Sequence, residues 1–226
     1  MKMTVLCALS LCFCAAAALS LPRGKWAAEI LAQRTDKAPT IASSRFSIYP
    51  KTTASQSLKA TIKRAVSGIG GLGLDVEADD VSSVITGSQD AVFEAMSGVL
   101  GRACAVEGRP HVSMQCTISS DVFDVDIPER TRDADGWAID PPSRVACQFA
   151  VYSICELGSC DDSVYELASE SPSFVDERAL CFMLDGAGEE VFRVLRASYE
   201  LACKRSVSGH VVLTATLTAQ KSSWRS

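Results

Sequence analysis

Apolar residues recur along this chain in two patterns, and each predicts a type of secondary structure. Alternating apolar and polar residues, or short runs rich in β-branched and aromatic residues, are typical of strands. They occur in Arg45–Tyr49, Asp79–Thr86, His111–Ser119, Cys147–Ile154, Ala179–Leu184 and Val211–Ala219. Apolar residues three and four positions apart predict amphipathic helices. These fall in Ser57–Val66, in the segment from Gly87 to Ala103, weakly in Asp162–Glu170, and in Glu189–Lys204.

The chain contains an internal repeat. Ser83–Asp121 aligns with Phe182–Gln220 at a constant offset of 99 residues, and eight of the 39 aligned pairs are identical, among them His111 and His210. Upstream, Tyr49 matches Tyr152 at an offset of 103 residues. A repeat of this kind indicates a duplicated unit. We therefore expect a first repeat at residues 45–121, an acidic and proline-rich linker at 122–144, and a second repeat at 145–222.

Each repeat reads as strand, helix, strand, helix, strand. A fourth strand beside the middle one would complete a βαββαβ unit. Right-handed crossovers then place both helices on one face of an antiparallel sheet and leave the other face uncovered. The sequence therefore predicts an α+β fold with two such units in tandem.

Residues before the first predicted strand have a different character. Lys2, the apolar run Val5–Ala18 and the small residues at Ala18–Ser20 form a secretory signal pattern at residues 1–20. A retained membrane anchor is the alternative interpretation. Residues 21–44 are expected to be disordered or transit-like and to lie outside the fold. We expect a protein that enters the secretory pathway, destined for the extracellular space or an organelle such as a plastid, with no membrane association after signal cleavage.

Composition and motifs argue against several functions. The net charge of −5 and the lack of a basic cluster disfavour nucleic acid as a partner. Gly68, Gly70 and Gly73 match a dinucleotide-binding pattern, but they follow a helix and precede an extended segment, the reverse of what that motif needs. Cys155 and Cys160 could form a disulfide in an oxidising compartment. Cys104 and Cys203 read as buried apolar residues.

Catalytic and metal sites also find little support. His111 and His210 each open a strand, and two histidines fall short of the ligand set of a metal centre. The chain has no asparagine and no nucleophile elbow, so neither a Cys–His–Asn arrangement nor a GxSxG site can be assembled. We expect no metal, no catalytic residues and no enzyme activity.

The uncovered sheet face carries the candidate chemistry. Most of its side chains would be hydroxyl, amide or tyrosine groups: Ser47, Tyr49, Ser113, Gln115 and Thr117 from the first repeat, with Gln148, Ala150, Tyr152, Val212, Thr214 and Thr216 from the second. Such a surface suits a small, planar, polar ligand that packs on an aromatic ring. The alternative is that serine and threonine rows simply favour strands and face water or the partner repeat.

An ordered set of segments resembles the YkoF family, the thiamin/hydroxymethylpyrimidine-binding proteins. The segments are Arg45–Pro50, Ser82–Ser88 with Asp90–Phe93, Cys147–Tyr152, and Leu184–Gly186 with Glu190–Phe192. The resemblance spans residues 45–222. It implies ferredoxin-like units, a homodimer, and non-catalytic binding of thiamin or hydroxymethylpyrimidine as ligand, with no cofactor, in thiamin-precursor transport or salvage.

The resemblance and the open face together give the candidate binding residues: Ser47, Tyr49, Ser83, Gln115, Thr117, Ala150, Tyr152 and Thr214. The chain departs from the family where Cys155–Cys160 and Pro172 interrupt the first helix of the second repeat, and where it begins with a signal-like segment. Two alternatives stay open: a regulatory or scaffold module that dimerises without a ligand, and an enzyme of thiamin salvage.

Overall fold

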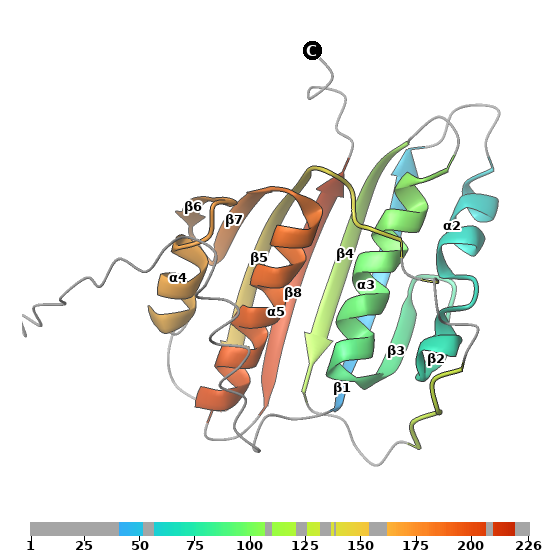
Figure 1. Cartoon of the computed structure of the whole chain (residues 1–226), viewed down its shortest axis with the longest axis horizontal. Coiled ribbons are helices and arrows are strands. Elements are labelled where there is room, and N and C mark those ends of the chain that lie inside the picture. The colour runs from blue at the N-terminus through green and yellow to red at the C-terminus, as the bar shows by residue number, and fades with distance from the viewer. Residues whose placement is uncertain are drawn as a thin grey trace, which may run out of the picture.

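The computed structural model describes residues 41–51, 57–106, 110–120, 126–131, 137, 139–153, 162–206 and 210–219. They form an α+β fold in which an antiparallel sheet carries helices on one face (Figure 1). The strands are β1 (Ile41–Lys51), β2 (Leu74–Ala78), β3 (Ser83–Ser88), β4 (His111–Ser119), β5 (Val145–Ser153), β6 (Phe174–Arg178), β7 (Cys181–Gly186) and β8 (Val211–Ala219). The helices are α2 (Leu58–Val66), the short 3₁₀ helix η1 (Ile69–Leu72), α3 (Gln89–Cys104), α4 (Asp162–Ser169) and α5 (Gly188–Arg205).

One continuous sheet replaces the two sheets expected from the repeat. The eight strands run in the order β2-β3-β1-β4-β8-β5-β7-β6. Read outward from the β4–β8 pair, the two halves have the same order, with β1 and β5 in equivalent positions. β4 and β8 pair antiparallel from Val112 opposite Ala219 to Ser119 opposite Val212. Each is the last strand of its repeat and would otherwise expose an unpaired edge, which the pairing removes.

Several predicted boundaries shift. β1 begins at Ile41, so residues 41–44, expected before the fold, belong to the sheet, and Ala42 and Ser44 are fully buried. The expected strand Asp79–Thr86 is instead a tight turn at residues 79–82 followed by β3, while β2 precedes the turn and supplies the fourth strand. In the second half, Ala179 and Leu180 are likewise the turn between β6 and β7 rather than the start of a strand.

Local sequence explains the helices of the first half. Ser57 and Ser88 cap α2 and α3, and the side chain of Ser88 accepts a hydrogen bond from the amide of Ala91 at 3.2 Å. The glycine-rich segment contains η1 and connects α2 to β2. Gly68 and Gly73, on either side of η1, adopt left-handed backbone angles (φ 83° and 76°), which glycine tolerates best. The segment follows a helix and leads into β2, the reverse of the strand-to-helix order that a dinucleotide-binding motif needs.

The expected linker contributes to the core. We name its described residues, 126–131, 137 and 139–144, the strap. Trp137 is buried, and its indole N–H donates to the carbonyl of Ser67 at 2.7 Å. Arg130 binds Glu94 on α3 through two hydrogen bonds of 2.8 and 3.0 Å. Residues 122–144 were predicted as an acidic and proline-rich linker, and the strap within it contacts α3 and the end of α2.

The helices also join the two halves. Gln89 at the start of α3 donates to the buried carboxylate of Glu200 on α5 at 2.9 Å, and Arg196 bridges Glu200 and Asp90 at 3.0 and 2.5 Å. The prediction that Cys104 and Cys203 are buried apolar residues is confirmed, and burial raises the pKa of both thiols to about 12. Within the described part of the chain, no helix combines the length and apolarity needed to cross a membrane.

Candidate ligand-binding trough

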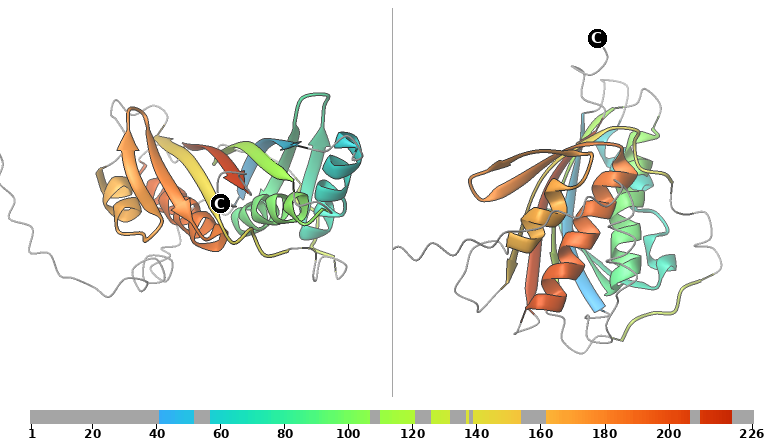
Figure 2. Two further views of the ribbon diagram at one scale, coloured as in Figure 1. Left: turned by 90° about the horizontal axis from the view of Figure 1, so that it is seen from above. Right: turned by 60° about the vertical axis from the view of Figure 1, so that its left-hand side comes forward.

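The sheet face opposite the helices is hollowed. Seen from above, the β2–β3 and β6–β7 hairpins rise at the two ends of the sheet, and the four middle strands form the floor between them (Figure 2). A cavity of about 540 Å³ occupies this hollow, and both halves of the chain line it. We name it the trough. Its volume is typical of sites for small organic ligands.

Two rows of polar side chains cross the floor from half to half. Residues directly opposite each other in paired strands share one face of the sheet, so the strand register gives the rows. The first row is Ser47, Gln115, Thr216 and Gln148, and the second is Arg45, Thr117, Thr214 and Ala150. Apart from Arg45 and Ala150 at the ends of the second row, the floor rows consist of hydroxyl and amide groups, and the β4–β8 pair lies at their centre.

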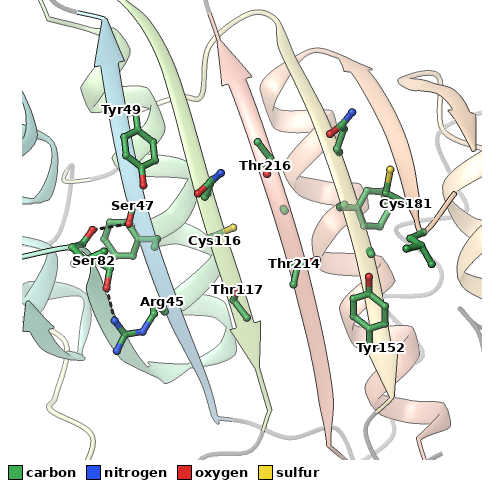
Figure 3. A pocket seen from close by; sticks show the side chains of 18 residues that line it. Arg45, Ser47, Tyr49, Ser82, Cys116, Thr117, Tyr152, Cys181, Thr214 and Thr216 are labelled. Carbon is green, nitrogen blue, oxygen red and sulfur yellow. Dashed lines mark hydrogen bonds between the residues drawn. The ribbon is translucent and has the colours of Figure 1, made fainter. Parts of the chain in front are cut away.

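The two tyrosines of the repeat lie at opposite corners of the trough (Figure 3). Tyr49 and Tyr152 are 53% and 43% exposed, so each has a ring face free for contact. They are separated by three strand spacings and by six residues along the strands. Standard strand geometry converts this to roughly 25 Å. One small heterocycle cannot touch both rings, so the trough offers two places at which a ring could stack.

The turn of the β2–β3 hairpin is fixed to the floor by side chains. Ser47 donates its hydroxyl to the carbonyl of Val81 at 2.9 Å, and Arg45 contacts both Ser82 and the carboxylate of Asp79, the latter at 3.0 Å. The carboxylate of Asp79 also accepts hydrogen bonds from the backbone amides of Val81 and Ser82, at 2.8 and 2.6 Å. These amides, together with Arg45, lower the pKa of Asp79 to about 2.

The equivalent turn in the second half has different chemistry. Leu180 occupies the position of Val81 with a positive φ of 69° and is 85% exposed above the trough. Cys181 stands where the first half has Ser82. Ala150 replaces Ser47 and cannot donate the hydrogen bond that Ser47 gives to its hairpin. The wall on this side is therefore more apolar, and it carries a thiol.

Seven of the eight predicted site residues line the trough: Ser47, Tyr49, Gln115, Thr117, Ala150, Tyr152 and Thr214. Ser83 does not. It lies opposite Phe46 in the register, which turns it toward the helix side of the sheet, where it borders a second cavity beside α2. Ser82 takes the place expected for it. Alternation along a strand defines two faces but not which face is open, and only the pairing with β1 decides that.

Other lining residues were not predicted as binding residues. Arg45 belongs to a segment that carries the family resemblance, Cys181 to the predicted strand Ala179–Leu184, and Gln148 and Thr216 to the predicted open face. Extending the repeat alignment into the hairpin turns would have pointed to Val81 with Leu180 and to Ser82 with Cys181.

Alternative sites receive no support from the geometry. His111 lies opposite Lys51 at the ends of β4 and β1, and His210 precedes β8. Within the described ranges, no three histidine, cysteine or acidic side chains cluster as they would around a metal ion. Cys155 and Cys160, which could form a disulfide in an oxidising compartment, lie outside the described residues.

Fold and site together define an α+β protein whose sheet forms a polar trough shared by two similar halves. Residues 41–122 match the family model described as the YKOF-related family. This match confirms the resemblance read from the sequence for the first half, from β1 to β4. No curated protein matches the chain.

Proposed function

We propose that the trough binds the aminopyrimidine of thiamin or free hydroxymethylpyrimidine, without catalysis, as part of thiamin-precursor transport or salvage. The observation that carries this proposal is the pairing of an amide- and hydroxyl-lined floor with an exposed tyrosine at each end. The family match of the first half supports the choice of ligand.

The floor has the groups that an aminopyrimidine requires. This heterocycle presents an amino donor beside a ring-nitrogen acceptor. A glutamine amide offers an acceptor beside a donor, so one side chain can pair with that edge, and a threonine hydroxyl can serve as either partner. Gln115 and Gln148 share one floor row, with Thr216 between them. Tyr49 then offers a ring against which the heterocycle stacks.

Calorimetric titration of the purified protein with hydroxymethylpyrimidine and thiamin tests the proposal. We expect saturable binding that Tyr49→Ala or Tyr152→Ala weakens, whereas the matched Tyr→Phe variants keep the ring and the affinity. Affinity unaltered in both alanine variants would contradict the pocket assignment. No heat at millimolar concentration of either compound would favour the ligand-free dimerisation module. Chromatography of the same mixtures would reveal any turnover, as expected of a salvage enzyme.

The same proposal includes finer features of the chain. Each half, with its outward strand order, is taken as a ferredoxin-like unit, and the whole protein as a homodimer. Light scattering of the eluted protein measures the oligomeric state. Residues 1–20 are taken as a cleaved secretory signal, and N-terminal sequencing of the protein from its native source locates the mature start.

A further inference from the structure

Charge is sparse on the trough surface and occurs in a pair. Among the described residues that line the trough, Arg45 is the only charged one. Its guanidinium lies 3.0 Å from the carboxylate of Asp79, across the turn of the β2–β3 hairpin. At the border of the same face, Arg144 binds Asp185 at 2.8 and 2.9 Å. The charged side chains at the trough therefore occur as ion pairs, and each pair has no net charge.

Both Arg45 and Asp79 stay ionised at every physiological pH, so the pair has no net charge. Two backbone amides and Arg45 hold the carboxylate, and the pKa of Asp79 is lowered to about 2. Arginine does not deprotonate in proteins. Asp80, the next residue of the turn, borders the second cavity rather than the trough. A ligand that enters the trough thus meets no uncompensated charge among the described residues that line it.

A charged ligand would lose part of its hydration in the trough without gaining a counter-charge. Thiamin carries a permanent positive charge on its thiazolium ring, and a phosphate ester of hydroxymethylpyrimidine is an anion, whereas hydroxymethylpyrimidine itself is uncharged at neutral pH. We propose that the trough selects the uncharged pyrimidine over its cationic and anionic derivatives, and that the Arg45–Asp79 pair sets this selectivity. This inference rests on the proposed function.

The second half shows that the pair is not a requirement of the fold. The residues equivalent to Arg45 and Asp79 are Gln148 and Arg178, so the internal repeat preserves the hairpin but not the charge pair. The substitution Arg45→Gln therefore places in the first half the residue that the second half already carries, on an equivalent strand.

Charge-swap titrations test the proposal. Calorimetry would measure hydroxymethylpyrimidine, thiamin and hydroxymethylpyrimidine phosphate against the wild type, Arg45→Gln, Asp79→Asn and the double variant. We expect the wild type to bind the neutral pyrimidine roughly tenfold more tightly than either charged compound. Arg45→Gln leaves Asp79 uncompensated and should shift the preference toward thiamin roughly tenfold. Asp79→Asn leaves Arg45 uncompensated and should shift it toward the phosphate.

The double variant restores neutrality and should restore the preference for the uncharged compound, which separates charge from loss of the hairpin contacts. Equal affinity loss for all three compounds in both single variants would overturn the proposal, because that pattern reports a loosened turn. A wild type that binds thiamin as tightly as the neutral pyrimidine would overturn it too, while leaving the proposed function standing. Failure of all three compounds to bind the wild type would remove the proposed function, and this inference with it.

Discussion

The two halves of the molecule share a strand order but differ in the chemistry that they bring to the trough. The first half supplies Arg45, Ser47 and Ser82, which bind one another or the hairpin turn beside them. The second half supplies Gln148, Ala150 and Cys181 at the equivalent positions. The two halves keep the same strand order while their lining residues differ. A ligand that relies on hydrogen bonds should therefore interact unequally with the two ends.

The helix side differs in the same way. Gly98 and Gly101 on α3 lie against the strap: an added Cβ would come within 2.5 Å of the Trp137 ring at Gly98 and within 2.7 Å of the carbonyl of Ile139 at Gly101. The equivalent residues on α5 are Ala197 and Glu200, and Glu200 binds α3 instead. Two glycines on α3 admit the strap, whereas Glu200 on α5 supports the contact between the halves.

The largest expected effect comes from removing the anchor of the strap. Trp137→Ala deletes a buried ring that packs on Gly98, stacks with Arg102 at 5.1 Å and donates to Ser67. Substitutions of this kind cost about 3–5 kcal/mol. We expect a loss of that size in the free energy of unfolding, measured with urea.

Tyr165→Ala on α4 is the matched control in the second half. Its ring is partly exposed and contacts Phe174 and Phe182, so the cost should be clearly smaller. A loss of less than about 1 kcal/mol in the free energy of unfolding for Trp137→Ala would show that the strap contributes little to the stability of the core.

Cysteine reactivity distinguishes the trough from the core. Burial raises the pKa of Cys104, Cys116 and Cys203 to about 12, and that of Cys147 above its usual value. Cys181 is partly exposed in the trough wall. Because the thiolate is the reactive form, iodoacetamide at pH 7.5 should label Cys181 and spare those four, as mapped by mass spectrometry. Labelling of Cys104 at the rate of Cys181 would contradict the described burial.

A smaller effect should follow from exchanging one hydroxyl between the halves. Ser47→Ala removes the hydrogen bond to Val81, worth about 1 kcal/mol, so affinity for hydroxymethylpyrimidine should fall roughly fivefold if the turn must be fixed for binding. Ala150→Ser is the reciprocal change in the second half and should not weaken binding. Identical losses in both variants would mean that the halves contribute equally.

Acid should loosen the first hairpin turn and leave the second unchanged. The folded-state pKa of Asp79 lies at about 2, below its ordinary value of 3.8. Its contribution to stability is therefore complete above about pH 4 and is lost as the pH falls toward 2. Amide exchange of Val81 and Ser82, followed by NMR after correction for intrinsic rates, should lose protection across this window in the wild type but not in Asp79→Asn.

Local patterns predicted the elements well where one face of a strand or helix is buried. His111–Ser119 and Val211–Ala219 are strands with the predicted bounds, because alternation with a buried face leaves little freedom. The hairpin turn escaped prediction because side-chain hydrogen bonds of Asp79 create it within an otherwise strand-like segment. Trp137 escaped because its partners, Ser67 and Gly98, lie far away in the sequence.

Most residues of the candidate site could be predicted from the repeat and the open face. That both halves line one shared trough could not be predicted. The antiparallel pairing of β4 with β8 turns two expected surfaces into one trough, and no local pattern encodes which edge strands meet. The Arg45–Asp79 contact was missed for a similar reason, since it joins a strand to a turn that the sequence placed inside another strand.

The most direct test of the central claim uses the side-chain amides of three glutamines. In a ¹H–¹⁵N spectrum titrated with hydroxymethylpyrimidine, the NH₂ signals of Gln115 and Gln148, assigned through Gln→Ala variants, should shift together along one saturation curve. Gln89 is buried between α3 and α5, where it binds Glu200, and its signal should stay in place. A shift of Gln89 without Gln115 and Gln148, or no shift at all, would contradict binding in the trough.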